Sequence, residues 1–149
     1  MGARYHQHAG APCELRRGGA VILYCPLVPA RSPSELPAAF ADAVNRGDLD
    51  AAVDLWSPDA VMVSASGEPI EGLGAVRGAL QALIGSGVKI RIEVASMHAS
   101  AGVALASGTL TITSPDGFSQ SSDSVVAYER GEDGGWRIAI DAPWGLPGL

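Results

Sequence analysis

Apolar side chains recur every three or four residues in the first half of the sequence, and this spacing predicts amphipathic helices. Leu36, Phe40 and Val44 form the first such stripe. Ser34 can cap the helix that carries them, and the segment Asn45-Arg46-Gly47 ends it. The folded part of the chain is therefore expected to begin near Ser32, with a helix.

Two further helices follow from the same spacing. Asp48 caps a short second helix, on whose inner face Trp56 is the last residue before Ser57-Pro58-Asp59 stops it. A third helix is expected over 73–84, ended by glycine. Its inner side chains are Val76, Leu80 and Leu83.

From Val88 onward the apolar period changes from about four residues to two, which is typical of strands with one buried face. Glycine-rich and Asp-Gly turns separate the strands. The long strands are expected at about 88–98, 103–113, 119–130 and 136–141, with short ones at 60–65 and 69–71. Along the chain the helices come first and the strands, linked by hairpins, come last. This order predicts an α+β fold, in which one curved antiparallel β-sheet wraps the N-terminal helices.

Composition divides the chain of 149 residues into a leader and one domain. Residues 1–31 hold four arginines and one glutamate, a charge of +3, whereas residues 32–149 hold six basic and fifteen acidic side chains, a charge of −9. An acidic domain disfavours nucleic acid as a partner, because affinity for phosphate backbones comes from clustered Lys and Arg. We expect residues 1–31 to be a flexible leader and residues 32–149 to be the domain.

The leader holds both cysteines, Cys13 and Cys25, and two of the three histidines, His6 and His8. The domain therefore has neither a disulfide framework nor a thiolate metal site, and no metal is expected. The leader is interpreted as an unstructured extension, with a signal sequence ending near 28–30 as the alternative. No apolar stretch reaches the ~18–20 residues of a membrane span, so we expect a cytoplasmic protein that binds no membrane.

Four short motifs are spread over about three quarters of the chain. They are Phe40-x3-Val44-Asn45-Arg46-Gly47-Asp48-Leu49-Asp50, Leu55-Trp56-Ser57-Pro58-Asp59-Ala60-Val61, Gly72-x2-Ala75-Val76-Arg77 and Gly135-Trp136-Arg137-Ile138-x2-Asp141. These motifs resemble the ketosteroid-isomerase and SnoaL-like branch of the nuclear-transport-factor-2-like superfamily. The resemblance implies a cone-shaped, cystatin-like α+β barrel, usually a homodimer, with a pocket between the sheet and the first helices. Isomerases, polyketide cyclases, hydrolases, dehydratases and non-catalytic domains share this scaffold, so the fold alone does not name a reaction.

In the ketosteroid isomerases, a carboxylate moves a proton while a tyrosine and a protonated acid bind the enolate oxygen. Carried over by position, the base falls on Ser64, the tyrosine on Phe40 and the acid on Asp123. Only the acid is kept, so classical steroid isomerisation by this route is not expected. If its strand face lines the pocket, desolvation raises the pKa of Asp123 and makes it a proton donor or relay. The alternative is a solvated carboxylate on an outward face.

The other site candidates are fewer and weaker. His98, at the end of the first long strand, could act as a general acid or base, or could be a surface residue. Asp141 is expected to cap a turn through its side chain. No phosphate-binding loop or nucleophile elbow is present in the domain, so no cofactor is expected. The expected ligand-binding residues are Phe40, Val44, Trp56, Met62, Val125 and Trp144.

Two functions remain open at this point. The first is an isomerase-, cyclase- or dehydratase-type enzyme that shifts a proton next to a carbonyl of a small apolar ligand, using Asp123 with water, Ser64 or His98. The second is a non-catalytic ligand-binding or homodimerisation module. In the second case the small residues Ala104, Ala106 and Gly108 are expected to let another sheet approach closely.

Overall fold

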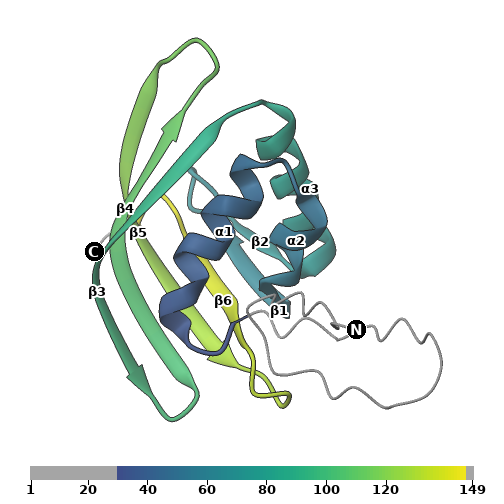
Figure 1. The fold of residues 1–149 in the computed structure, drawn as a ribbon, viewed down its shortest axis with the longest axis vertical. Coiled ribbons are helices and arrows are strands. Elements are labelled where there is room, and N and C mark those ends of the chain that lie inside the picture. The colour runs from purple at the N-terminus through teal and green to yellow at the C-terminus, as the bar shows by residue number, and fades with distance from the viewer. Residues whose placement is uncertain (1–29, 147–149) are drawn as a thin grey trace, which may run out of the picture.

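The computed structural model describes residues 30–146, which form three helices on one side of a curved sheet (Figure 1). The cysteines, His6 and His8, and the leader up to residue 29 lie outside the described residues. Ala30 is already buried, and its carbonyl accepts a hydrogen bond from the backbone N–H of Trp136 (2.9 Å). Packing into the domain therefore includes Ala30, two residues before the start expected at Ser32.

The helices follow the predicted stripes, with different ends. A 3-10 turn, Pro33–Glu35, leads into α1 (Leu36–Asn45), and Ser34 does not cap it. The helix α2 (Leu49–Asp54) has the predicted cap, because the Asp48 side chain accepts from the Ala51 N–H at 3.0 Å. The helix α3 spans Leu73–Gly85. Among residues 30–146 no helix is long and apolar enough to cross a membrane.

Six strands form one open sheet in the order β2-β1-β6-β5-β4-β3. Their pairings are antiparallel except for β1 with β6, which is parallel and departs from the all-antiparallel expectation. The strand β1 begins at Trp56, so this tryptophan is a strand residue and not the end of the second helix. The strands are β1 (Trp56–Val63), β2 (Pro69–Glu71), β3 (Lys89–Ser100), β4 (Val103–Thr113), β5 (Ser119–Arg130) and β6 (Trp136–Ala142).

The core lies between the helices and the concave face of the sheet. Trp56, Leu36, Leu80 and Val76 are among its largest fully buried side chains. Ala104 and Ala106, expected to face a second sheet, are buried on this inner side. The expectation was wrong because the small side chains of β4 make room for the domain's own interior.

Register shifts interrupt the alternation of β3 and β6. In β3 the shift falls between Val94 and Ser96, opposite Gly108 of β4. A Cβ atom at Gly108 would lie 2.1 Å from the Glu93 carbonyl oxygen, so the bulge needs glycine there. In β6, Ile140 pairs with Ala127 and Ile138 with Tyr128, which leaves Ala139 as an extra residue. Each bulge reverses which side chains beyond it face inward.

Candidate active site in the concave face

A cavity lies between the start of α1 and the inner face of the sheet, and most of its lining is apolar. Its volume is about 40 Å³. A water molecule needs roughly 10–15 Å³ by this measure, so the cavity admits a few waters or part of a small ligand. The lining residues are Leu36, Pro37, Phe40, Ile92, Leu110, Ser124, Val126, Tyr128, Ile138, Asp141 and Pro143.

Asp141 is the acidic group of this cavity, although its residue surface is only 9 % exposed. Burial raises the pKa of Asp141 to about 7, and burial is the single cause of that shift. The carboxyl group is therefore divided between its protonated and ionised forms near neutral pH. A group in this state can both accept and donate a proton, which is the requirement for general acid–base catalysis.

Tyr128 supplies a phenol from the neighbouring strand. It is buried and lines the same cavity. Its pKa is raised above the ordinary value, first by burial and then by the charge of Asp141. The hydroxyl therefore stays protonated at neutral pH and can donate a hydrogen bond, and it lies close enough to Asp141 for the two groups to interact electrostatically.

Serine hydroxyls complete the polar part of the site. Ser124 is buried and lines the cavity two residues before Val126 on β5. Ser122 donates a hydrogen bond from Oγ to the Pro143 carbonyl oxygen (2.7 Å). This bond ties the segment after β6 to β5 and holds Pro143 in the cavity wall. A second hollow of about 10 Å³ shares Ser124 and Tyr128 with the first cavity.

The bulge in β6 brings Asp141 into the cavity. Val126 faces inward, and Asp141 is its partner across the ladder. Without the extra Ala139, the register set by Tyr128 and Ile138 would place Ile140 opposite Val126. Asp141 would then point outward. The observed Ile140 is 46 % exposed, so the acid and the isoleucine have exchanged faces.

The structure places Asp123, the expected acid, on the opposite face of the sheet, where it is exposed. Val125 shares this outward face and is absent from the cavity lining. We expected the odd-numbered side chains of β5 to face inward, and this was wrong. The side chains that face inward are those at the even-numbered positions from Ser122 to Tyr128. Tyr128 was the available signal: a strand that carries a single aromatic residue tends to bury it.

The two weaker catalytic candidates also lie outside the cavity. The Ser64 hydroxyl makes hydrogen bonds within the β1–β2 turn, with Ser66 Oγ (2.9 Å) and the Glu68 N–H (3.1 Å). His98 is exposed on β3 and pairs with Leu105 of β4. Neither side chain lines the hollow that holds Asp141.

The expected ligand-binding residues are split between the wall and the core. Phe40 lines the cavity, and its ring packs edge-on against Trp56, with centroids 5.9 Å apart. Trp56 and Val44 are buried in the core behind that wall. Met62 packs against the core from β1, and Trp144 is 38 % exposed beside Pro143.

Metal ligands do not gather around this site. Within residues 30–146 no three His, Cys, Asp or Glu side chains come together in a way that could hold a metal ion. The chemical groups that the cavity offers are a carboxyl, a phenol and a serine hydroxyl.

Known structures share this arrangement of helices and sheet. A domain from Thiobacillus denitrificans, provisionally described as a calcium/calmodulin-dependent protein kinase type II association domain, is 19% identical, with a TM-score of 0.65 over 74% of this chain and 92% of its own. An NTF2-like protein with a cystatin-like fold from Novosphingobium aromaticivorans is 21% identical, with a TM-score of 0.63 over 77% and 80%. An NTF2-like protein from Streptomyces avermitilis, provisionally described as a dehydratase, is 19% identical, with a TM-score of 0.59 over 73% and 90%.

These identities support the fold and not a shared activity. The sequence matches no functionally curated protein at a significant level. The model of the SnoaL-like domain matches residues 38–139, which is more than half of the chain and runs from within α1 to within β6. The chain has the fold of the NTF2-like structures above, and it belongs to the SnoaL-like domain family.

Proposed function

We propose that this domain binds a small, largely apolar carbonyl compound in the cavity and moves a proton on it with Asp141. One observation carries the proposal. A carboxyl group lies buried in an apolar hollow where its pKa is raised to about 7. Burying an ionisable carboxyl group costs folding free energy, and acids with perturbed pKa values in cavities are typical of catalytic sites.

The chemistry follows from the three polar groups. The ionised Asp141 removes a proton from the carbon next to the carbonyl. Tyr128, whose raised pKa keeps it neutral, donates a hydrogen bond to the oxygen on which negative charge develops, and Ser124, which lines the same cavity, donates a second. The protonated Asp141 then returns the proton to another carbon, which gives an isomer, or to a leaving hydroxyl, which gives dehydration.

The cavity restricts the size of the ligand. A volume of about 40 Å³ is small, so a ligand with a few heavy atoms, or one end of a longer ligand, fits this shape. The similar structure from Streptomyces avermitilis is provisionally described as a dehydratase, and dehydration is one of the two outcomes proposed above. The alternative is ligand binding without turnover, for which the carboxyl group is only a recognition element.

Cyclopentanone tests the two alternatives, because its α-hydrogens exchange with deuterium when a base removes them. The full chain is incubated with the ketone in D₂O, and loss of the α-proton signal is followed by NMR. We expect catalysed exchange that rises with pH through about 7, because the base form is the ionised one. Asp141→Asn is expected to lose at least tenfold of that rate, given the ~10²–10⁴-fold effects typical of general bases.

The matched control is Asp123→Asn, which removes an exposed carboxylate from the other face of the sheet. It should exchange like the unaltered chain. Amide chemical shifts of Ser124, Val126 and Tyr128 report binding independently of exchange. Shifts without catalysed exchange would establish a binding module, and equal exchange rates in both variants would remove Asp141 from the chemistry.

A further inference from the structure

Apolar side chains gather on the convex face of the sheet, whereas the three helices of residues 30–146 lie on the concave side (Figure 1). Val103 is 58 %, Leu105 53 % and Ile140 46 % exposed. The ladders align Leu105 with Ala127, and Ala127 with Ile140, in one row across β4, β5 and β6. Clustered exposed aliphatic residues mark interaction surfaces, whereas single ones are ordinary. These four residues and Val125 are named the convex patch.

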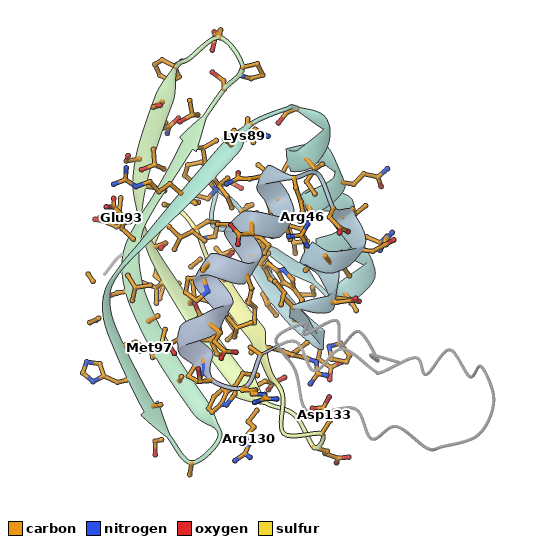
Figure 2. All side chains as sticks on the ribbon, viewed as in Figure 1. Arg46, Lys89, Glu93, Met97, Arg130 and Asp133 are labelled. Atoms are coloured by element: carbon orange, nitrogen blue, oxygen red, sulfur yellow. The ribbon has the colours of Figure 1, made fainter. Side chains whose placement is uncertain are left out.

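Two carboxylates lie beyond the patch on the same face. Thr109 of β4 pairs with Glu93 on one side and with Asp123 on the other, so both acids belong to one row. Both are exposed, and Figure 2 shows Glu93 on the side of the sheet away from the helices. Glu93 pairs with Arg91 (2.5 Å), whereas Asp123 forms no ion pair with any residue in 30–146. The face thus offers an apolar patch and then, toward the β4–β5 hairpin, an unpaired carboxylate.

The leader has a matching order of residues, counted back from the point where it joins the domain. Residues 20–28 are apolar without exception, and no charged residue occurs between Arg17 and Ala30. Arg16 and Arg17 come before the apolar run, separated from it by two glycines. An apolar segment followed by two cations is the complement of an apolar patch followed by carboxylates.

The junction between leader and domain lies at the end of the sheet where the patch begins. The Ala30 carbonyl accepts from the Trp136 N–H (2.9 Å) at the start of β6. Trp136 pairs with Arg130 of β5, and the neighbouring Glu129 pairs with Val103 of β4. Figure 2 shows Arg130 at this end of the sheet. The leader is therefore attached beside the Val103 end of the patch.

The leader is long enough to cover the patch and to reach the acids. Val103 and Thr109 are six residues apart on β4, which is roughly 20 Å, and each strand that is crossed adds ~4.8 Å. The thirteen residues from Arg17 to Ala30 span at most about 43–47 Å when extended. This length exceeds the path across β6, β5 and β4 and along the patch, with chain left to turn around the end of the sheet.

We propose that residues 16–28 of the same chain bind this face, with the apolar run 20–28 on the convex patch and Arg16 and Arg17 beside Asp123 and Glu93. This proposal does not rest on the proposed function of the cavity. Attachment to the domain gives the segment an effective concentration on the order of millimolar, so weak contacts suffice. Charge also favours this occupant, because the leader is basic and residues 32–149 have an excess of nine acidic side chains.

Covering the convex face sacrifices few hydrogen bonds to water. Hydroxyl groups next to the patch already bond to each other across the strands. The pairs are Ser96 with Ser107 (2.8 Å) and Thr111 with Ser121 (2.8 Å). The segment therefore gains apolar contact without leaving these groups unpaired.

Paramagnetic broadening in NMR spectra of the full chain tests the proposal. A nitroxide spin label is attached to Cys13, three residues before Arg16, in a Cys25→Ala variant that has no other thiol. A bound leader brings the label to the acidic row, so we expect the amide signals of Thr109 and Asp123 to broaden most. The amide signal of Gln81, on the exposed side of α3, should keep its intensity.

The arginine pair is tested by Arg16→Glu combined with Arg17→Glu. This variant should lose the broadening at Asp123, because two carboxylates then face the acidic row. The matched control is Arg4→Glu, which makes the same kind of charge change outside residues 16–28 and should keep the broadening.

The patch is tested by Leu105→Glu, which brings a charge under the apolar run and should also remove the broadening at Asp123. Leu105 is half exposed, so the fold is kept, as circular dichroism should confirm. The matched control is Phe118→Glu, at an exposed apolar residue (67 %) of the β4–β5 hairpin outside the patch, and it should keep the broadening. Broadening that persists in both the arginine variant and Leu105→Glu would overturn the proposal.

Two further outcomes would overturn it. Broadening that is strongest at the Trp136 amide, next to the junction, would show an unbound leader that stays near its attachment. A mixture of isotope-labelled chain without the spin label and spin-labelled chain without the isotope should give no broadening. Broadening in that mixture would show that the face is covered by the leader of a second copy.

Discussion

Asp141 and Val126 face each other across the β5–β6 ladder, and both side chains line the cavity. The pairing depends on Ala139, the extra residue that reverses the inward and outward positions of β6. The acid thereby takes a place that regular alternation would give to Ile140. Its burial accounts for the pKa of about 7 and makes the stability of the domain depend on pH.

Asp141→Asn should flatten the dependence of stability on pH. Between pH 4 and 7 the unfolded chain has released the Asp141 proton while the folded chain keeps it, so the free energy of unfolding falls as pH rises. A shift of about 3 pH units corresponds to about 4 kcal/mol. Urea unfolding at pH 4.5 and pH 8 measures this fall in the free energy of unfolding. The control Asp123→Asn should show the same fall as the unaltered chain. An equal fall in Asp141→Asn would show that Asp141 titrates normally.

Gly108→Ala should strongly destabilise the domain. The added Cβ would lie 2.1 Å from the Glu93 backbone oxygen, which no side-chain rotation can relieve. We expect a loss of about 3 kcal/mol or more. Gly78→Ala is the control, because nothing lies within 4 Å of its Cβ position in α3, and it should stabilise the domain by up to about 1 kcal/mol. The midpoint temperatures of thermal unfolding compare the two variants with the unaltered chain. A neutral Gly108→Ala would argue against the tight bulge in β3.

Asp48→Ala should cost about 1 kcal/mol, because it removes the side-chain cap of α2. Asp50→Ala removes a neighbouring carboxylate that pairs with Arg77 at 2.7 Å, both groups being exposed. An exposed ion pair contributes little, so this variant should lose less than about 0.5 kcal/mol. Chemical denaturation of the two variants compares their losses of free energy of unfolding. The reverse order would mean that the ion pair, not the cap, fixes the start of α2.

Asn45→Ala should expose part of the edge strand β3. The Asn45 side chain accepts from the Ile90 N–H (2.7 Å) and donates to the Ile90 carbonyl (2.9 Å), so one amide satisfies both backbone groups. Their loss should cost about 1–3 kcal/mol. Hydrogen exchange at the Ile90 amide should accelerate in this variant but not in Gln81→Ala on the exposed side of α3. Unchanged exchange would show that other groups protect this edge.

The sequence predicts the secondary structure of this protein well. Within residues 30–146, periods of about four and two residues locate the three helices and the four long strands, because burial of one face repeats regularly along each element. The errors lie at the ends: Trp56 starts β1, since α2 ends at Asp54. The family resemblance is confirmed by the match over residues 38–139.

The site was harder to predict, and the reason is geometric. A strand has two faces, and an error of one residue exchanges them, as it did for Asp123 on β5. The bulge at Ala139 has no clear sequence signature, so Asp141 could not be assigned to the inner face by counting. Phe40 was placed on the cavity side because the helix stripe that carries it has only one apolar face.

The extra residue in β6 has a consequence for how such a domain could change during evolution. Losing or gaining one amino acid there would exchange the inward carboxyl group of Asp141 for the aliphatic side chain of Ile140, with every other residue type unchanged. Relatives with nearly the same composition in this strand would then differ in whether their cavity holds an acid, according to strand length alone. Comparisons that only score substitutions would overlook that difference.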